Sequence, residues 1–328
     1  MKWNIIGIVV ALIIIVGLIS FELYSNIQKS PPYESSTNSG SKINLRVISL
    51  SPSDTQILVS LGLGKYVVGV DSYSYSLLKS LNDTSLLPYN ITIFNQISPP
   101  NISGLVELKP SVIIGEEGLI GNYFTQMKEA GLNVYLTNDD FASNYYEIEQ
   151  SIMNVSRLFN SSNEGNQLNQ WMNQKLQEFS TTGNISVADI IWICPNYDFF
   201  TAGGNVFINS IISLSGGINV FGSQSGYPLL NPGQLLLANP DVIFVQVIYN
   251  LSYTEYLVNH MPGIQNVSAY KDHRIYFISE NAINLVNEPG PLSVYAIPMI
   301  HDIIYGEAPE YINWTWVKQN INPTLPVY

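Results

Sequence analysis

Charge is scarce in this sequence, and most of the charge that is present is negative. Only 12% of the 328 residues are charged, with 13 Lys and Arg against 25 Asp and Glu, giving a formal net charge of −12. The basic residues form no cluster, so the sequence offers no positive surface to the phosphate backbone of a nucleic acid. Because 46% of the residues are hydrophobic, the chain can bury a large core, and its length predicts about two domains.

Cysteine and histidine are also rare, which argues against two kinds of stabilisation. The single cysteine, Cys194, has no partner for an intramolecular disulfide, and its apolar strand pattern predicts a small buried side chain. The three histidines, His260, His273 and His301, are widely spaced and lack a partner pattern such as H-x-x-E-H. We therefore predict no metal site built by the protein and no resident cofactor.

One long apolar run lies near the N-terminus. The run covers residues 5–21, and its length is close to the roughly 20 residues that a membrane-spanning helix needs. Lys2 precedes the run and Glu22 follows it, which places the N-terminus inside and the rest of the chain outside the cell. A cleaved signal peptide is the alternative and would make the protein secreted, but no small-x-small cleavage site follows the run. We expect residues 1–24 to be an uncleaved, single-pass plasma-membrane anchor without a lipid-bearing cysteine.

Asparagine-based sequons support an extracellular location. Nine Asn-x-Ser/Thr triplets occur, more than chance supplies for this composition. The candidate glycosylation sites are Asn82, Asn90, Asn101, Asn154, Asn160, Asn184, Asn250, Asn266 and Asn313. We expect a glycosylated extracellular domain, tethered by residues 25–43, which are rich in Ser, Asn and Pro and predict a flexible linker.

Beyond the tether, strand and helix patterns alternate. The expected strands are LRVISL, YVVGVD, SVIIGEE and NVYLTN in the first half, and VADIIWIC, DVIFVQ and RIYFIS in the second. Such alternation is typical of βαβ units around a mostly parallel sheet. A closing helix is expected over about residues 291–305, with a kink at Pro298.

An internal repeat indicates two related α/β lobes. NISGLVELKPSVII, which begins at Asn101, and NPGQLLLANPDVIF, which begins at Asn231, correspond at an offset of 130 residues. This offset is the length of a whole domain. We expect an N-terminal lobe at 44–142 and a C-terminal lobe at 183–310, with connecting helices at 143–182 and a C-terminal tail at 311–328. No Gly/Pro/Ser hinge interrupts the connection, which predicts a stiff link.

The hydroxyl-rich turn SLSPSD raises the question of a catalytic serine. Ser51 precedes Pro52, and Asp54 stands three residues after Ser51, which is the pattern of a helix N-cap. A nucleophilic serine would need a G-x-S-x-G elbow and a positioned histidine, and neither is nearby. We predict a cap and no enzymatic activity; an α/β hydrolase is the disfavoured alternative.

Candidate ligand contacts follow the expected strands. Glu116 and Glu117 come directly after SVIIG, where open α/β sheets bind ligands, although a solvated loop is the alternative. Aromatic residues occupy similar positions and would suit a large or ring-rich ligand. They are Tyr73, Tyr75, Tyr197, Phe200 and Tyr227.

Several segments together resemble the helical-backbone class of extracellular solute-binding proteins, which deliver cobalamin, ferric siderophores or haem to ABC importers. They are RVISLSPSDTQILVSLGLGKYVVGVDSYS, NISGLVELKPSVIIGEEG, FTAGGNVFINSIISLSGGINVF, NPGQLLLANPDVIFV, HRIYFIS and NEPGPLSVYAIPMIHDIIYG. The resemblance implies two Rossmann-like lobes, a rigid connecting helix near residues 163–179, and a ligand held between the lobes. It also implies a monomer whose partners are a metal chelate, an ABC permease and the membrane.

Two departures from that family bear on the ligand and on docking. Cobalamin-binding relatives place aromatic residues at the positions of Tyr73, Phe200 and Tyr227, and a further one where this chain has Glu116. The resemblance therefore favours a ferric siderophore-type chelate over cobalamin or haem. Ser103 and Gly233 stand where many members carry a glutamate that meets the permease. Either Glu107 substitutes, or docking differs, or the protein is a surface glycoprotein of the same fold without transport.

Overall fold

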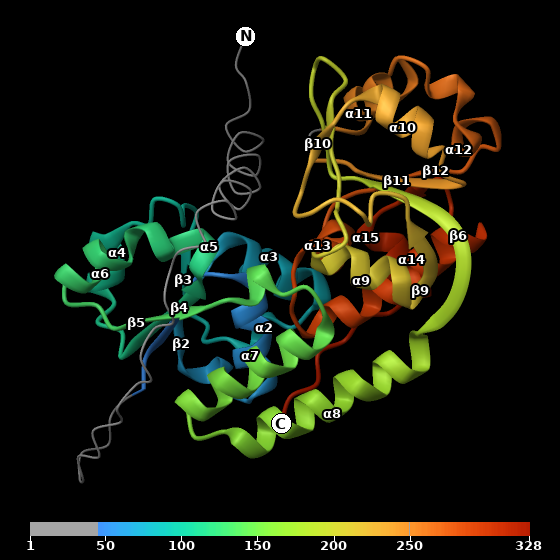
Figure 1. The fold of residues 1–328 in the computed structure, drawn as a ribbon. Coiled ribbons are helices and arrows are strands. Elements are labelled where there is room, and N and C mark those ends of the chain that lie inside the picture. Colours follow the sequence, from blue (N-terminus) through green and yellow to red (C-terminus); the bar gives the residue numbers. More distant parts are fainter. Residues whose placement is uncertain (1–44, 249) are drawn as a thin grey trace.

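The computed structural model describes residues 45–248 and 250–328, which form two α/β lobes lying side by side (Figure 1). The expected anchor at 1–24 and tether at 25–43 lie outside these residues. Within the described ranges, no helix combines the length and the hydropathy needed to cross a membrane. The predicted α/β class with parallel sheets and two lobes is confirmed.

The first lobe is built on a five-stranded parallel sheet of order β3-β2-β1-β4-β5. Its strands are β1 (Val47–Ser49), β2 (Val67–Asp71), β3 (Thr92–Phe94), β4 (Val112–Glu116) and β5 (Val134–Thr137). Its helices are α2 (Pro52–Ser60), α3 (Ser72–Leu81), α4 (Ile102–Glu107), α5 (Glu117–Ile120) and α6 (Phe124–Glu129). This strand order is that of a dinucleotide-type doubly wound fold, in which the order reverses between β1 and β4.

The second lobe has its own five-stranded parallel sheet, of order β13-β12-β11-β6-β9. Its strands are β6 (Thr181–Ile190), β9 (Ser215–Asn219), β11 (Val242–Gln246), β12 (Ile275–Ile278) and β13 (Tyr311–Ile312). Its helices are α9 (Phe207–Leu214), α10 (Pro232–Ala238), α11 (Leu251–Asn259), α12 (Ser268–Lys271), α13 (Ala282–Asn287), α14 (Ala296–Tyr305) and α15 (Trp314–Asn320). A small antiparallel sheet of β7 (Trp192–Ile193), β8 (Phe199–Phe200) and β10 (Leu229–Leu230) was not expected from the sequence.

The repeat seen in the sequence is a structural repeat. Asn101 caps α4 by accepting from the backbone N–H of Gly104, and Asn231 caps α10 in a capping box with Gln234. Each of these helices leads into a central strand, β4 or β11, and the two strands have the same length at the same 130-residue offset. The carboxyl ends of these strands are therefore equivalent positions in the two lobes.

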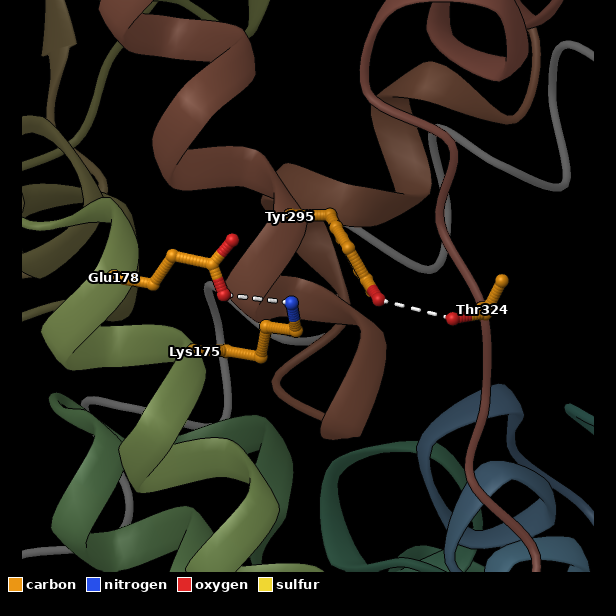
Figure 2. Close-up of polar contacts among 4 residues, drawn as sticks. All are labelled: Lys175, Glu178, Tyr295 and Thr324. Carbon is orange, nitrogen blue, oxygen red and sulfur yellow. Dashed lines mark hydrogen bonds and ion pairs between the residues drawn. The ribbon is translucent and has the colours of Figure 1, made fainter.

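The lobes are joined by two helices and by shared packing. α7 (Tyr145–Leu158) and α8 (Ser162–Phe179) connect the two sheets, and α8 runs along one edge of the molecule (Figure 1). One hydrophobic cluster includes Val47 of β1, Ile148 of α7 and Ile300 of α14, so the core is continuous from lobe to lobe. Figure 2 shows the Lys175–Glu178 ion pair on α8 and, across from it, the hydrogen bond between Tyr295 and Thr324.

The segment 311–328 is more than the tail that the sequence predicts. It supplies the edge strand β13 and the helix α15, in which Val317 is fully buried. It then returns to the first lobe, where the backbone N–H of Tyr328 donates to the carbonyl of Ser60 at 2.9 Å. The indole N–H of Trp314 donates to the carbonyl of Ser80, also in the first lobe. The Asn313 cap of α15 is a local signal, but the return to the first lobe depends on long-range contacts, which no local pattern could reveal.

Two local expectations need correction. The closing helix is divided into a 3-10 helix at Pro291–Tyr295 and the α-helix α14, and Pro298 lies in the first turn of α14, where a missing N–H costs little and no kink is required. Cys194 is half-buried, and it lies in a turn in which its own N–H donates to the carbonyl of Asp198. The apolar run ends before Cys194, so it is not the buried strand residue that was expected.

Candidate ligand-binding cleft

A cavity of about 450 Å³ lies between the two lobes, within the range of about 300–1,000 Å³ that is common for ligand pockets. Segments that follow the strands of both sheets line it. The first lobe contributes Pro52 after β1, Tyr73 after β2, Ile97 after β3, Glu116 at the end of β4 and Asp140 after β5. The second contributes Ile191 after β6, Val247 and Ile248 after β11, and Glu280 and Asn281 after β12. The carboxyl ends of two sheets therefore face one cavity, which is the ligand position expected for open α/β sheets.

The turn SLSPSD positions one wall of this cavity. The Ser51 side chain accepts a hydrogen bond from the backbone N–H of Asp54, which confirms the predicted N-cap of α2. Asp54 lies in the first turn of α2 but is not at the surface. It is fully buried and accepts hydrogen bonds from the hydroxyls of Ser51 and Thr137. Ser53, in the same turn, donates to Glu116 at the cavity. The turn thus orients a ligand-facing carboxyl group through hydrogen bonding.

Three of the carboxyl groups that line the cavity are buried deeply enough to be desolvated. Glu116 is only 4% exposed, Asp140 accepts from the backbone N–H of Gly118 at 2.7 Å, and Glu288 follows α13 in the second lobe. Burial raises the pKa of Asp140 and Glu288 to about 8 and holds the pKa of Glu116 well above its ordinary value. The negative charges of Asp140 and Glu288 add to the increase at Glu116. The acids of the two lobes therefore interact across the cleft.

Further carboxyl groups lie behind these three. Asp54 and Asp139 are buried side by side in the first lobe, and desolvation raises the pKa of both, that of Asp139 to about 6. Asp71 caps α3 by accepting from the N–H groups of Tyr73 and Ser74, and burial raises its pKa to about 6. Asp189 of β6 is fully buried in the second lobe, where Gln246 donates to it, and burial raises its pKa to about 8. Acid is thus concentrated around the cleft.

No basic side chain offsets this acid at the cavity. Among the described residues, no Lys, Arg or His lines the cavity, and the one ion pair, Lys175–Glu178, is on the exposed face of α8. The other polar groups are the exposed carboxyl of Glu280, the amide of Asn205, the amides at α13, where Asn281, Asn284 and Asn287 lie on one side, and the phenols of Tyr73 and Tyr227. The remaining lining is largely aliphatic.

Three of the seven candidate ligand contacts line the cavity: Tyr73, Glu116 and Tyr227. The positions expected for the other four are corrected as follows. Tyr75 lies two residues beyond Tyr73 on α3, on the opposite side of the helix, and packs against the main hydrophobic cluster. Glu117 is the first residue of α5 and does not line the cavity.

The remaining two corrections concern the second lobe. Phe200 belongs to β8 in the small antiparallel sheet and packs into the core. Tyr197 has a left-handed backbone conformation, with φ of 72°, and packs against the second lobe's separate core cluster. Neither lines the cavity. The sequence located both near a strand end but could not show which way the following turn directs each ring.

Asp140 and Glu288 are cavity residues that the sequence analysis missed. Asp140 follows the strand NVYLT as Glu116 follows SVIIG, so the rule about strand ends could have identified it. Glu288 follows a helix whose asparagines recur at the three-residue spacing of Asn281, Asn284 and Asn287, which was a second available signal. What the sequence could not show is that α13 lies opposite β4 and β5.

The asparagines of all nine sequons are exposed, and none lines the cavity. Ser103 on α4 and Gly233 on α10 are also exposed, at equivalent points of the two lobes. An acid, Glu107, is exposed on α4, whereas its counterpart on α10 at the same offset is Leu237, which is 87% exposed. The two helices thus present different chemistry at matching positions.

Comparison with known proteins shows which proteins this chain is similar to. The family described as "Periplasmic binding protein" matches residues 47–282. An uncharacterized ABC transporter substrate-binding lipoprotein of Bacillus subtilis is 24% identical over 79% of this chain and 80% of its own length. A vitamin B12-binding protein of Vibrio cholerae is 27% identical over 61% of this chain and 69% of its own length.

Solved structures agree on the fold. A periplasmic heme-binding protein of Vibrio cholerae superposes with a TM-score of 0.67 at 19% identity, covering 80% of this chain and 99% of that protein. A possible iron-binding periplasmic solute-binding protein of Staphylococcus epidermidis has a TM-score of 0.67 at 21% identity, covering 79% of this chain and 98% of that protein. At these identities the likeness concerns the fold.

Proposed function

The chain belongs to the periplasmic binding protein family, and from this premise we propose that it is the substrate-binding component of an ABC importer. The observation that carries the proposal is the cavity of about 450 Å³ at the carboxyl ends of both parallel sheets. Both lobes contribute to it, so a ligand there would contact both at once. Such a protein binds a ligand and presents it to a permease, and it catalyses no reaction.

The ligand we propose is a metal chelate of the ferric siderophore type. Relatives named for vitamin B12 binding and a structural neighbour named for heme binding support a chelate. Glu116 at the cavity, in place of an aromatic residue, favours a ferric chelate over cobalamin or haem. We also propose that residues 1–24 anchor the protein at the outer face of the membrane. The continuous core between the lobes supports small lobe movements on binding.

The alternative, a surface glycoprotein without transport, would fit a cleft that side chains fill. The cavity between the lobes is not filled in this way, which favours a binding protein. The exposure of all nine sequon asparagines is compatible with either function.

Binding of a ferric chelate is the direct test. The full-length protein in detergent should show a rise in melting temperature and a change in Tyr/Trp fluorescence with micromolar ferric trihydroxamate. A ligand at a hundred times its Kd stabilises the native state by about 2.7 kcal/mol. The Tyr227→Ala variant should bind about tenfold more weakly, because a ring at the cavity wall is lost. Tyr197→Ala is the matched control, since Tyr197 lies outside the cavity, and it should bind normally. Equal affinity of the two variants would argue against this cleft as the binding site.

Glycosylation can be tested separately from ligand binding. We expect peptide mass spectrometry of the protein from its own membrane to find glycans on sequon asparagines such as Asn82 and Asn313, which are exposed. Asn95 and Asn122 are also exposed but lack a Ser or Thr two residues later, so both should be unmodified. Unmodified peptides at every sequon would disprove the glycoprotein proposal and leave ligand binding untouched.

A further inference from the structure

The carboxyl groups at the cavity have oxygens that the protein does not use. Glu116 accepts from Ser53 through Oε1, and no hydrogen bond within the described part of the chain reaches its Oε2. Asp140 accepts from Gly118 through Oδ2, while its Oδ1 is buried without a partner. The Glu288 carboxyl also lines the cavity, and the hydrogen bonds of this residue within the described part of the chain are made by its backbone N–H and carbonyl. Such unpaired oxygens in a low-dielectric site are costly unless a proton or a ligand satisfies them.

Further buried acids add negative charge next to these carboxyl groups and make their ionisation less favourable. Asp54 and Asp139 are buried near enough for their charges to raise the pKa of Glu116, and each has one buried oxygen, Oδ1 and Oδ2 respectively, without a hydrogen-bond partner. The charges of Asp54, Asp139, Asp140 and Glu288 all oppose ionisation of Glu116. Burial and mutual repulsion raise the pKa values of these acids, so a ligand that brings a positive charge to the cleft would be favoured over one that brings a negative charge.

The rest of the lining also suits a positive group and not a negative one. No Lys, Arg or His of the described chain lines the cavity, so a carboxylate or catecholate on a ligand would find no counter-charge. The rings of Tyr73, Tyr227 and Phe141 lie on the cavity wall, and aromatic faces attract ammonium groups. The amides of α13 can hydrogen-bond a ligand of either sign and therefore do not decide its charge.

We infer that this cleft selects ligands that carry a positive charge, such as a chelate with a pendant ammonium group, and that Glu116, Asp140 and Glu288 hold that charge between the two lobes. The inference rests on the proposed function of the same cleft and specifies the charge class of its ligand. Anionic haem and anionic ferric catecholates would be excluded by the same residues.

The test compares two probes that share one chelate and differ at a single amine. One is a ferric trihydroxamate with a free ammonium group, and the other is the same chelate with that amine acetylated, which makes it neutral. Isothermal titration with the full-length protein in detergent should show at least tenfold tighter binding of the ammonium form. Glu288→Gln should remove most of that difference, because it should weaken binding of the ammonium form much more than binding of the acetylated form. Glu129→Gln is the control, because Glu129 is exposed at the end of α6 and does not line the cavity, and it should behave as the wild type.

The outcomes separate this inference from the proposed function. Equal or tighter binding of the acetylated chelate would overturn the charge inference and leave the ferric-chelate proposal standing. If neither chelate binds, the ferric-chelate proposal fails, and melting-temperature shifts with a panel of size-matched organic cations, neutral compounds and anions decide the charge inference. Shifts with ammonium compounds alone would support it. A panel without a cationic hit, or with shifts by anions, would overturn it.

Discussion

Lowering the pH from about 8 to about 4 is expected to stabilise this protein, which is the reverse of ordinary acid denaturation. Burial raises the pKa of Asp140, Asp189 and Glu288 to about 8 and that of Asp71 and Asp139 to about 6. In the unfolded chain these groups ionise near their ordinary values of about 4. Between the two pKa values the native state binds more protons than the unfolded state, so stability falls as the pH rises.

The pH dependence of stability can be tested at a single residue, Asp189, which lies outside the cavity lining. It is fully buried, and among the described residues Gln246 donates to its two carboxyl oxygens at 3.2 and 3.3 Å. Its contribution is fully present below the unfolded pKa and is lost as the pH rises to the folded value of about 8. At about 1.4 kcal/mol for each pKa unit, the loss between about pH 4 and about pH 8 is roughly 5 kcal/mol.

The measurement is the free energy of unfolding across this pH range. Asp189→Asn should be several kcal/mol more stable than the wild type near pH 8 and close to it near pH 4, because an amide does not ionise. Asp241→Asn is the control. Asp241 is exposed, and hydrogen bonds from Ser186 lower its pKa, so it contributes stability at neutral pH that is lost in acid. A wild-type profile that peaks near pH 7, or an Asp189→Asn profile as steep as the wild type, would contradict this account.

Tyr145→Ala is expected to lower the free energy of unfolding by about 3–5 kcal/mol, the usual cost of removing a buried aromatic ring. Tyr145 begins α7 and is only 4% exposed. Its ring packs edge-on against Phe207 of α9, with centroids 4.9 Å apart, and its hydroxyl donates to the carbonyl of Ser293 at 2.8 Å. Both partners belong to the second lobe, so this side chain ties the connecting helices to that lobe.

Two further variants separate the ring from the hydroxyl. Tyr145→Phe keeps the ring but leaves the Ser293 carbonyl without this donor, which should cost about 1–3 kcal/mol. Tyr146→Ala changes the neighbouring residue, which is 67% exposed, and should stay within about 0.5 kcal/mol of the wild type. Chemical denaturation measures all three. A loss for Tyr145→Ala no larger than that for Tyr146→Ala would show that this contact does not stabilise the junction of the lobes.

Much of the fold was readable from the sequence, because it depends on local patterns. The strands β2, β4, β5, β11 and β12 were expected as apolar runs, and the 130-residue repeat predicted equivalent central strands in two lobes. Connecting helices were expected at 143–182, and the hydroxyls of SLSPSD predicted a cap at Ser51. Apart from the repeat, which compares two distant segments, each of these signals comes from residues within one or two turns or one strand of each other.

The composition of the cleft required the tertiary structure. Glu116 was identified from its place after a strand, but Glu288 and Asp140 became its neighbours only when α13 and β5 were placed around the same cavity. The same distance in sequence hid the return of residues 311–328 to the first lobe.

Sequence alone thus determined that this chain has two parallel-sheet lobes, since hydrophobic periodicity and capping act over a few residues. The sequence also identified three residues that line the cavity, Tyr73, Glu116 and Tyr227. It predicted the same role for Tyr75 and Phe200, which pack against the core, because a sequence does not specify the direction of a side chain. Only the tertiary structure decided that acids from both lobes face each other without a basic partner. Desolvation and mutual repulsion of carboxyl groups depend on distances in space, and residues as far apart as Glu116 and Glu288 acquire those properties only when the chain has folded.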